Sequence, residues 1–505
     1  PKERPMAVER EVKLGAWAGF ELPDFGDDVA GLSIAPRPPR TLTAVYYDTA
    51  DLRLARWGIT IRHRSGNGSE WTVKLPEDDD GPALVRRELD FPGPASRMPT
   101  EATAVLRAYL RGTPLVPVAR LKTVRSGVDV LDGEGVRVAE IVDDEVSVIH
   151  GGRVAARFRE VEVEIDERAP AELLGCLVAR LRSAGAGSPD PTPKVIRALG
   201  PRALAPPEVE VHRIGRKATT ADMVTQAVAT SVVRILRHDP GVRLGDDPED
   251  VHQARVGTRR LRSDLRTFSS VLDGVWVARL RQELQWLARL LGDVRDADVM
   301  DERLRRQVAA LESQSAEGVA PLFRRLAAER DEARGALAIA LDSPRYITLL
   351  EDLVAAAREP RFDHGAHARG RKLIPDLVAR PWTSLWKEVS RLPSRPSSDE
   401  LHQVRIRAKR ARYAAEAVAP VAGKKATSFA RRLADLQTVL GDHHDAIVAE
   451  SWLNAAAAAT TTLDPPVQAA AAKLIAIQQA EARDRLKNWR RAWKAAKAEK
   501  RRARL

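Results

Sequence analysis

Residues 8–14 read Val8-Glu9-Arg10-Glu11-Val12-Lys13-Leu14, and this segment decides the fold of the first part of the chain. Side chains of a β-strand alternate between its two faces, so Glu9, Glu11 and Lys13 share one face while most of the apolar side chains share the other. Residues 158–165 repeat this alternation, with apolar residues on one face and three glutamates on the other. These are Glu160, Glu162 and Glu164. The two segments predict strands of an antiparallel β domain, each with a charged face.

Basic side chains occupy alternate positions in the strands predicted between those two segments. They are Arg62 and Arg64 in residues 59–64, Lys74 in residues 70–75, and Arg86, which shares a face with Glu88, in residues 84–91. Alternating charged residues usually mark a solvated strand face, but strands that carry both acids and bases suit one type of ligand. Carboxylates bind a hard divalent cation such as Mg²⁺ or Mn²⁺, and Lys and Arg bind the phosphate oxygens that share this cation. The pattern therefore favours a site for phosphate chains with a divalent metal.

The sequence changes character near residue 200. Before that point, short alternating segments such as 44–48 and 136–142 are separated by Gly, Pro and Asp, with brief helical segments at 101–111 and 171–183. After it, long Ala-, Leu- and Arg-rich segments show the 3.6-residue period of helices. We expect an α+β multidomain protein: a β domain at residues 1–203, a proline-containing linker at 204–218 and an all-helical domain at 219–503.

Two motifs recur in the helical part at nearly the same spacing. Val251-His252-Gln253-Ala254-Arg255-Val256 returns 150 residues later as Leu401-His402-Gln403-Val404-Arg405-Ile406. Leu291-Gly292-Asp293, followed by Asp296-Ala297, returns 149 residues later as Leu440-Gly441-Asp442, followed by Asp445-Ala446. Because two matched motifs at one spacing are hard to obtain by chance, we predict a duplicated helical bundle with repeats at about residues 219–357 and 362–500.

The histidine motifs begin two cationic stripes. On a helix, positions i, i+3, i+7, i+10 and i+14 lie on one face. From His252 this face carries Arg255, Arg259, Arg262 and Arg266, and from His402 it carries Arg405, Lys409 and Arg412. A solvated face normally mixes acids with bases, and like charges one turn apart destabilise a helix, so stripes without acids favour a bound polyanion. Each histidine is either a neutral hydrogen-bonding residue near a helix start or a direct phosphate ligand.

The composition restricts the compartment and the partner. The net charge of +12 points to an anionic partner, although an Arg- and Ala-rich composition also arises from GC-rich coding. The single cysteine, Cys176, excludes a disulfide framework and a multi-cysteine metal site. Residues 1–14 contain no signal-peptide core and no apolar segment is long enough to span a membrane, so we expect a cytoplasmic protein without a membrane partner. The stripes have almost no aromatic residues for base stacking, so nucleic acid is not an expected partner.

The motif order of residues 1–200 resembles the CYTH family, also called triphosphate tunnel metalloenzymes. The matching motifs are Glu9-x-Glu11-x-Lys13, Tyr46-Tyr47-Asp48-Thr49, the strand at 61–64, Trp71-Thr72-Val73-Lys74 and the strand at 158–164. The resemblance implies an antiparallel eight-stranded β tunnel that acts on triphosphate with Mg²⁺ or Mn²⁺. It implies metal ligands at Glu9, Glu11, Glu160, Glu162 and Glu164, and phosphate contacts at Arg62, Arg64, Lys74, Arg86, Arg125 and Lys194. Catalytic roles fall on Lys13, Glu88 and Asp143, although Asp144 fits the same tunnel acid as Asp143.

Residues 219–500 resemble the CHAD family, named for histidines on α-helices, through the duplication, the stripes and the two Leu-Gly-Asp motifs. The resemblance implies two pseudo-symmetric four-helix bundles with a basic surface that binds inorganic polyphosphate. The matching positions are His252, Arg255, Arg259, Arg260, Arg262, Arg266, His402, Arg405, Arg407, Lys409, Arg410 and Arg412. The repeats differ at one place, because His443-His444 stands where the first repeat has Val294-Arg295.

We therefore expect a protein that binds inorganic polyphosphate and triphosphate, has a metal-dependent triphosphatase in its tunnel domain and associates with polyphosphate granules. Two alternatives stay open: a polyphosphate-binding or targeting protein without catalysis, and a CYTH enzyme that processes nucleoside or thiamine triphosphates. The sequence has no P-loop, no dinucleotide-binding glycine motif in strand–helix context and no zinc-protease motif that would indicate another phosphate or metal chemistry. Nothing in the sequence predicts an oligomeric state.

Overall fold

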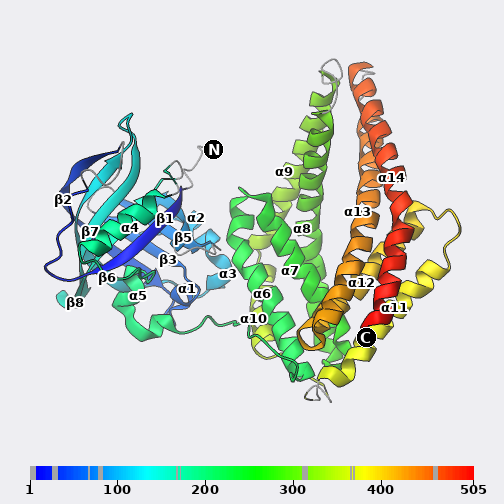
Figure 1. The fold of residues 1–505 in the computed structure, drawn as a ribbon, viewed down its shortest axis with the longest axis horizontal. Helices are drawn as coiled ribbons and strands as arrows, with labels where there is room; N and C mark the ends of the chain where they lie inside the picture. Colours follow the sequence, from blue (N-terminus) through cyan, green and yellow to red (C-terminus); the bar gives the residue numbers. More distant parts are fainter. Residues whose placement is uncertain are drawn as a thin grey trace. The chain divides into compact units, whose positions relative to one another are not determined.

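A computed structural model describes residues 7–25, 32–65, 69–77, 84–166, 169–170, 172–309, 317–363, 367, 370–458 and 465–504. By its internal contacts the chain divides into two compact units, Pro1–Glu208 and Val209–Leu505 (Figure 1). The division falls inside the segment predicted as a linker.

In the first unit, the described residues form eight antiparallel strands that close into a barrel in the order β1-β5-β4-β3-β2-β6-β7-β8. The strands are β1 (Ala7–Ala16), β2 (Ser33–Asp48), β3 (Thr60–Ser65), β4 (Ser69–Pro76), β5 (Leu84–Pro92), β6 (Val116–Leu131), β7 (Arg137–His150) and β8 (Arg153–Ile165). The predicted eight-stranded tunnel is confirmed. One strand, β6, was not predicted from the sequence. It contains Gly127, where an added Cβ would lie 2.2 Å from the carbonyl oxygen of Ile141 on β7.

The register of β1 decides which of its side chains point into the barrel. Lys13 lies opposite Glu162 of β8, inside the barrel. Val12 and Leu14 point the other way and are buried in a core cluster with residues of α4 (Leu173–Ser183). Full burial of an aliphatic side chain stabilises a fold by about 1.5–3 kcal/mol. The apolar half of each strand therefore fixes the direction of the charged half.

Short helices connect or cover parts of the barrel. They are α1 (Arg53–Arg56), α2 (Thr100–Val105), α3 (Arg107–Leu110) and α5 (Lys194–Leu199), which continues into the 3-10 turn η2 (Gly200–Leu204). The segment predicted as one helix at 101–111 is thus two helices. In α5, Val195 and Ile196 pack against Tyr46 and Leu121 of the wall, and this packing anchors Lys194 at the barrel interior.

The second unit is helical, as predicted. Its described helices are α6 (Thr220–Leu244), α7 (Pro248–Thr267), α8 (Gly274–Val308), α9 (Ala320–Asp342), α10 (Pro344–Arg358), α11 (Gly370–Ser390), α12 (Ser398–Ala422), α13 (Lys424–Ala458) and α14 (Pro465–Ala503), with 3-10 turns η3 (Ser269–Val271) and η5 (Glu317–Val319). In chain order α6, α7 and α8 correspond to α11, α12 and α13, and both α8 and α13 have 35 residues. Together, α9 and α10 correspond to the single long helix α14.

The break between α9 and α10 has a local cause. The Ser343 hydroxyl accepts the backbone N–H of Tyr346 at 3.3 Å and so caps the start of α10. Pro344 occupies the first turn, where its missing N–H costs no hydrogen bond, but inside a continuous helix it would remove one. The second repeat has no such Ser-Pro pair within α14 and runs through.

The two helices that carry the cationic stripes begin at equivalent caps. The Asp247 carboxylate accepts the backbone N–H of Glu249 ahead of α7, and Ser397 forms a capping box with Glu400 ahead of α12. Each cap lies five residues before the stripe histidine, His252 or His402. The start of each stripe is therefore fixed by the same local chemistry.

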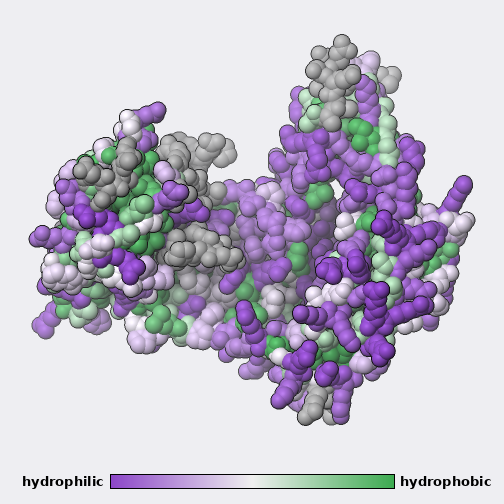
Figure 2. Space-filling model, in the orientation of Figure 1, coloured by the Kyte–Doolittle hydropathy of each residue, from purple (hydrophilic) through white to green (hydrophobic). Residues whose placement is uncertain are grey.

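Hydrophilic side chains cover much of the helical unit on the face drawn in Figure 2. Across the described residues, no helix combines the length and the apolar character that crossing a lipid bilayer requires.

Candidate functional site

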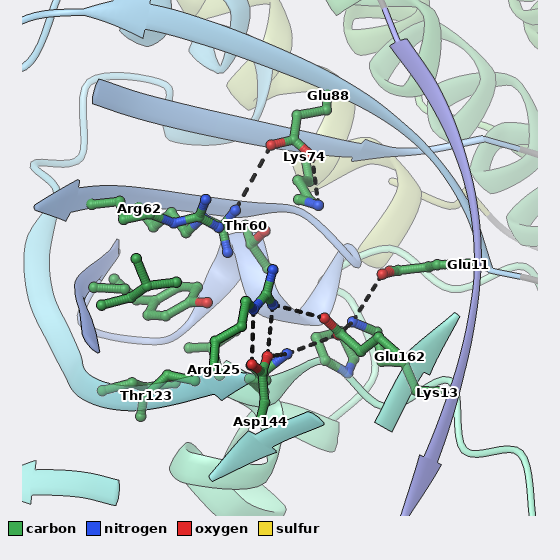
Figure 3. Close-up of a pocket in the computed structure, with 18 of the residues that line it drawn as sticks. Glu11, Lys13, Thr60, Arg62, Lys74, Glu88, Thr123, Arg125, Asp144 and Glu162 are labelled. Carbon is green, nitrogen blue, oxygen red and sulfur yellow. Dashed lines mark hydrogen bonds and ion pairs between the residues drawn. The ribbon is translucent and has the colours of Figure 1, made fainter. Parts of the chain in front are cut away.

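The barrel encloses a cavity of about 240 Å³ that is lined mainly by charged side chains (Figure 3). Its acids are Glu11, Glu88, Glu140, Asp144, Glu162 and Glu164. Its bases are Lys13, Arg40, Arg62, Arg64, Lys74, Arg86, Arg125 and Lys194. The structure thus brings most of the residues predicted for the tunnel to one surface, from strands that are far apart in the sequence.

Lys194 is the centre of the ion-pair network on one side of this cavity. Its Nζ lies 2.9 Å from Asp144, 2.8 Å from Glu160 and 2.8 Å from Glu162. Burial alone would lower the pKa of Lys194, but these three carboxylates raise it above its ordinary value. Lys194 is therefore a fixed cation, and it holds three buried carboxylates together.

Arg125 and Lys13 complete this network. Arg125 donates two hydrogen bonds to Asp144, of 2.8 and 2.6 Å, and lies 3.1 Å from Glu162. Lys13 Nζ lies 3.1 Å from Glu11 and contacts Glu162 as well (Figure 3). Burial opposes ionisation of Glu162, but Lys13, Lys194 and Arg125 hold its pKa well below the ordinary value.

The opposite wall has an excess of positive charge. Lys74 Nζ lies 2.6 Å from Glu88, and Arg62 lies 3.7 Å from the same carboxylate. Arg64 has no carboxylate partner within ion-pair distance among the described residues. Its pKa falls to about 10 because Arg62 repels its charge and because it is buried. An anion bound here would relieve that repulsion.

Tyr46 places a phenol in this cationic environment. Burial alone would raise the pKa of Tyr46, but Arg62, Lys194 and Arg64 lower it below the ordinary value. The lowered pKa strengthens the Tyr46 hydroxyl as a hydrogen-bond donor. The sequence identified Tyr46 only as part of a family motif.

The carboxylates near Glu164 fit a divalent cation by their chemistry. Burial raises the pKa of Glu164, and the neighbouring Glu140, Glu11 and Glu88 raise it further against the effect of Lys74. The Oε1 atom of Glu11 is buried and has no hydrogen-bond partner among the described residues. No three acidic, histidine or cysteine side chains converge as a closed ligand set in the described part of the chain. Mg²⁺ commonly takes only one or two carboxylates and completes its shell with waters and substrate phosphates.

Three of the residues predicted for the tunnel are not among the described residues that line the cavity. Asp143 accepts hydrogen bonds of 2.8 and 2.6 Å from Arg159 and is not part of the cavity lining; its neighbour Asp144 is. Glu160 is fully buried and contacts Lys194 from behind the lining. Glu9 pairs with Arg86 through the strand register, and its side chain lies outside the described residues. The sequence analysis missed Arg40 and Glu140, which line the cavity from β2 and β7.

In the helical unit, the two predicted stripes meet at Lys409. Burial lowers the pKa of Lys409 to about 7, and so do the charges of Arg259 and Arg255 on α7 and Arg405 and Arg412 on α12. The two repeats therefore contribute to one cluster of cations. We call these five residues the central cation cluster.

A second gathering of cations surrounds Arg266. The pKa of Arg266 falls to about 10 through burial and through repulsion by Arg410, Arg281 and Arg262. Arg281, on α8, was not predicted from the sequence because it belongs to neither stripe. Among the described residues, Arg259, Arg266, Arg405, Lys409 and Arg410 have no carboxylate within ion-pair distance, so their charge is available to an anionic ligand.

Other predicted cations are paired with acids, some on the same helix and some on a neighbouring helix. Arg260 donates to Asp264 at 3.1 Å and contacts Glu416; Arg412 donates to Glu416 at 2.7 Å. The remaining pairs are Arg407 with Glu388, 2.5 Å, and Arg255 with Asp296, 3.1 Å. The interpretation of the stripes as nearly free of acids thus does not extend to their surroundings. Asp264 and Glu416 lie one turn after Arg260 and Arg412 on the same helices. Glu388, Asp296 and Glu416 also reach cations of other helices.

The stripe histidines are neutral in the free protein at neutral pH. Burial lowers the pKa of His252 and that of His402, and neighbouring cations lower both further. The rings of His402 and His444 lie 4.2 Å apart, and burial together with His402 lowers the pKa of His444 to about 4. In the first repeat, Arg295 takes the place of His444 and contributes to the lowered pKa of His252.

Comparison with known proteins gives two domain families in the order expected. A CYTH domain matches residues 20–184, and a CHAD domain matches residues 226–454. Uncharacterized protein MT2285 of Mycobacterium tuberculosis is 32% identical over 480 residues, which cover 89% of this chain and 88% of that protein.

Two solved structures each align with a little over half of the chain. PptA from Streptomyces chartreusis is 24% identical and covers 55% of this chain and 100% of its own, with a TM-score of 0.47. The CHAD domain from the plant Ricinus communis is 28% identical and covers 57% of this chain and 96% of its own, with a TM-score of 0.46.

Proposed function

Since this chain belongs to the family of proteins in which a CYTH domain is followed by a CHAD domain, we propose that it binds inorganic polyphosphate and hydrolyses triphosphate in its tunnel with a divalent metal. CYTH domains generally act on triphosphates, and CYTH enzymes generally depend on Mg²⁺ or Mn²⁺. The observation that supports the catalytic proposal most is the barrel cavity, where acids and bases line one closed surface.

The excess cations of the tunnel would bind the substrate. Arg62 and Arg64 on β3 and Arg86 on β5, the strands on either side of β4, line the same cavity, and a guanidinium binds phosphate oxygens with paired N–H donors. Arg64 has the clearest need for an anion, because its ionisation is disfavoured by Arg62. A linear triphosphate would place its oxygens along this wall.

The carboxylates would serve the metal and the attacking water. Glu11 and Glu164, which line the cavity, would hold the cation. A bound divalent cation supplies charge neutralisation on the phosphate oxygens. Water attacks the terminal phosphorus as the bond to the bridging oxygen breaks, and orthophosphate and pyrophosphate leave. Glu88 is the carboxylate that would orient this water and accept its proton.

In the helical unit, the central cation cluster and the cations around Arg266 would bind a longer polyphosphate chain. Five cations meet there without enough acids to neutralise them, and phosphate groups would supply the missing negative charge. No divalent metal is required for this interaction, because only Arg255 and Arg412 of the five are paired with a carboxylate among the described residues and the positive charge stays in excess.

The test is a substrate panel on the purified full chain: tripolyphosphate, ATP, thiamine triphosphate and long-chain polyphosphate, each with Mg²⁺, Mn²⁺ or chelator. We expect metal-dependent release of orthophosphate from tripolyphosphate. Asp144→Asn should abolish turnover, since it weakens the paired hydrogen bonds from Arg125 and removes one of the three carboxylate charges that hold Lys194. The matched control is Glu145→Gln on the next residue of β7, which is exposed and should keep full activity.

A binding protein without catalysis is the second candidate. The cations Lys13, Arg125 and Lys194 already neutralise Glu162 and Asp144, as they would in a tunnel that only binds anions. Absence of turnover with every substrate and metal, together with retained polyphosphate binding, would favour this function over the triphosphatase. Turnover of ATP or thiamine triphosphate in preference to tripolyphosphate would assign a different substrate to the same tunnel.

A further inference from the structure

The Leu-Gly-Asp motif recurs in both repeats, yet it lies on α8 and α13 rather than on the helices that carry the stripes. Its leucines have an ordinary role, because Leu291 and Leu440 are buried in the core. Its glycines need another explanation. A glycine inside a helix costs conformational entropy and packs no side chain, so its presence at the same place in both repeats indicates that this surface of α8 and α13 is kept free of a large side chain.

Each glycine faces the guanidinium of the first arginine in a stripe. A Cβ built on Gly292 would lie 3.7 Å from Nε and 3.8 Å from Nη2 of Arg255. A Cβ built on Gly441 would lie 3.5 Å from Nε and 3.8 Å from Nη2 of Arg405. The same two atoms of the equivalent arginine therefore lie against the equivalent glycine, although the two sites are built from different parts of the chain.

We propose that Gly292 and Gly441 are positioning residues of the polyanion site, which leave free the space beside α8 and α13 that the guanidiniums of Arg255 and Arg405 occupy. This inference rests on the proposed polyphosphate binding by the helical unit. A Cβ built on either glycine would just reach van der Waals contact with the guanidinium, at 3.5–3.8 Å, so a side chain with atoms beyond Cβ would push the guanidinium away.

Repulsion between the clustered cations explains why these two arginines have to be positioned. Arg255 and Arg405 both lie close enough to Lys409 to lower its pKa, so like charges repel each of them from the position it occupies. An unanchored arginine would turn toward solvent and would have to be ordered again when the ligand binds, at an entropic cost. The space left free beside each glycine lets each guanidinium occupy this position before binding.

Arg255 and Arg405 differ in whether a carboxylate also holds the guanidinium. Arg255 is also held by Asp296, with Nη2 and Oδ1 3.1 Å apart. Arg405 has no carboxylate within ion-pair distance among the described residues, and its Nε is buried without a hydrogen-bond partner. Arg405 thus depends more on its glycine than Arg255 does, and its charge is less compensated.

The experiment is a double-mutant cycle on the full chain, with long-chain polyphosphate as the probe and affinity measured by titration calorimetry. Gly441→Val should weaken binding about tenfold, the size expected when one hydrogen bond to a charged group is lost. Arg405→Ala should weaken it to a similar degree. If the glycine acts through the arginine, the double variant should bind no more weakly than Arg405→Ala alone. Gly441→Val combined with Arg255→Ala should instead show additive losses.

Two controls separate this effect from damage to the helix. Gly335→Val introduces the same residue into α9, at an exposed helical glycine with nothing within 4 Å of a built Cβ, and should leave affinity unchanged. Gly441→Ala should retain binding, because a Cβ fits. If the valine variant loses its helical circular dichroism signal, Gly441→Ser replaces it in the same cycle.

The outcomes are distinct. Retained affinity in folded Gly441→Val or Gly441→Ser, or losses that add to that of Arg405→Ala, would overturn the positioning role while leaving polyphosphate binding intact. No binding by the unaltered chain would remove the proposed function itself, and this inference with it.

Discussion

Lys194 in the barrel and Lys409 in the helical unit are both lysines withdrawn from solvent, yet their neighbours have opposite charges. Lys194 lies within 2.9 Å of three carboxylates, and its pKa is raised. Lys409 lies among four arginines, and its pKa falls to about 7. Burial acts in the same direction on both side chains. The difference shows that the surrounding charges, rather than burial, decide whether a cation of this protein is structural or available to a ligand.

The largest expected effect comes from removing each lysine in turn. Lys194→Met leaves Asp144, Glu160 and Glu162 short of a cation and should destabilise the barrel by about 3–5 kcal/mol, as when one partner of a buried ion pair is removed. Lys409→Met relieves repulsion and should leave the stability of the helical unit unchanged or higher. Urea titration followed by hydrogen exchange of peptides from each unit measures both. Equal losses of stability in the two variants would show that the two lysines do not differ in their structural role.

Polyphosphate affinity should depend on the cations of the two stripes. Replacing Arg259, Arg262, Lys409 and Arg412 together should weaken binding by at least about a hundredfold at moderate salt, since each phosphate contact adds to affinity and to its salt dependence. Titration of the full chain at several salt concentrations measures the affinity and the slope. The control replaces four exposed cations outside the stripes: Arg306, Arg324, Lys473 and Lys487. Unchanged affinity in the first variant would exclude the central cation cluster as the site.

The pH dependence of binding should follow Lys409. Bound phosphate adds negative charge and raises the pKa of Lys409 above its free value of about 7. Below pH 7 the ammonium is already formed, and above it each binding event must take up a proton, so affinity should fall by up to about tenfold per pH unit above 7. Lys409→Arg, which stays charged, should flatten this dependence. A wild-type affinity that is constant from pH 6.5 to 8.5 would contradict the lowered pKa.

The weakest effect should come from removing an acid beside the central cation cluster. Glu416 compensates Arg260 and Arg412 at the edge of the central cation cluster. Glu416→Gln removes this compensation and should strengthen polyphosphate binding about threefold, with a cost in stability of about 1 kcal/mol, the scale of a partly exposed ion pair. Calorimetry and thermal unfolding measure the two changes. Weaker binding by a folded variant would mean that Glu416 positions the arginines rather than neutralising them.

Much of the barrel could be predicted from the sequence because alternation encodes it directly. Glu11, Lys13 and Glu162 share their inward direction with no other information than the period of a strand. Which of Asp143 and Asp144 points into the barrel could not be predicted, because the predicted strand ended at 142 and a shift of one residue exchanges the two faces. Strand β6 and helix α5 were not predicted either, although Arg125 and Lys194 were assigned from the family resemblance.

The helical site was predicted only along each helix. The 3.6-residue period aligned Arg255 with Arg259, but it carries no information about side chains from other helices. The acids that bind Arg255 and Arg260, Asp296 and Glu416, lie on α8 and α12 and meet them only through tertiary packing. Arg281 was missed for the same reason, and so was the role of the repeated glycines.

Positive charge has two uses in this protein: it is interleaved with acids and joined by a metal in the tunnel, and it exceeds the neighbouring acids and needs no metal in the helices. The decisive experiment is calorimetric titration of the full chain with long-chain polyphosphate in EDTA, beside tripolyphosphate turnover under the same conditions. We expect binding to persist in EDTA while turnover stops, and Mg²⁺ to restore the turnover. Loss of polyphosphate binding in EDTA, or hydrolysis that continues without metal, would show that the two uses are not distinct.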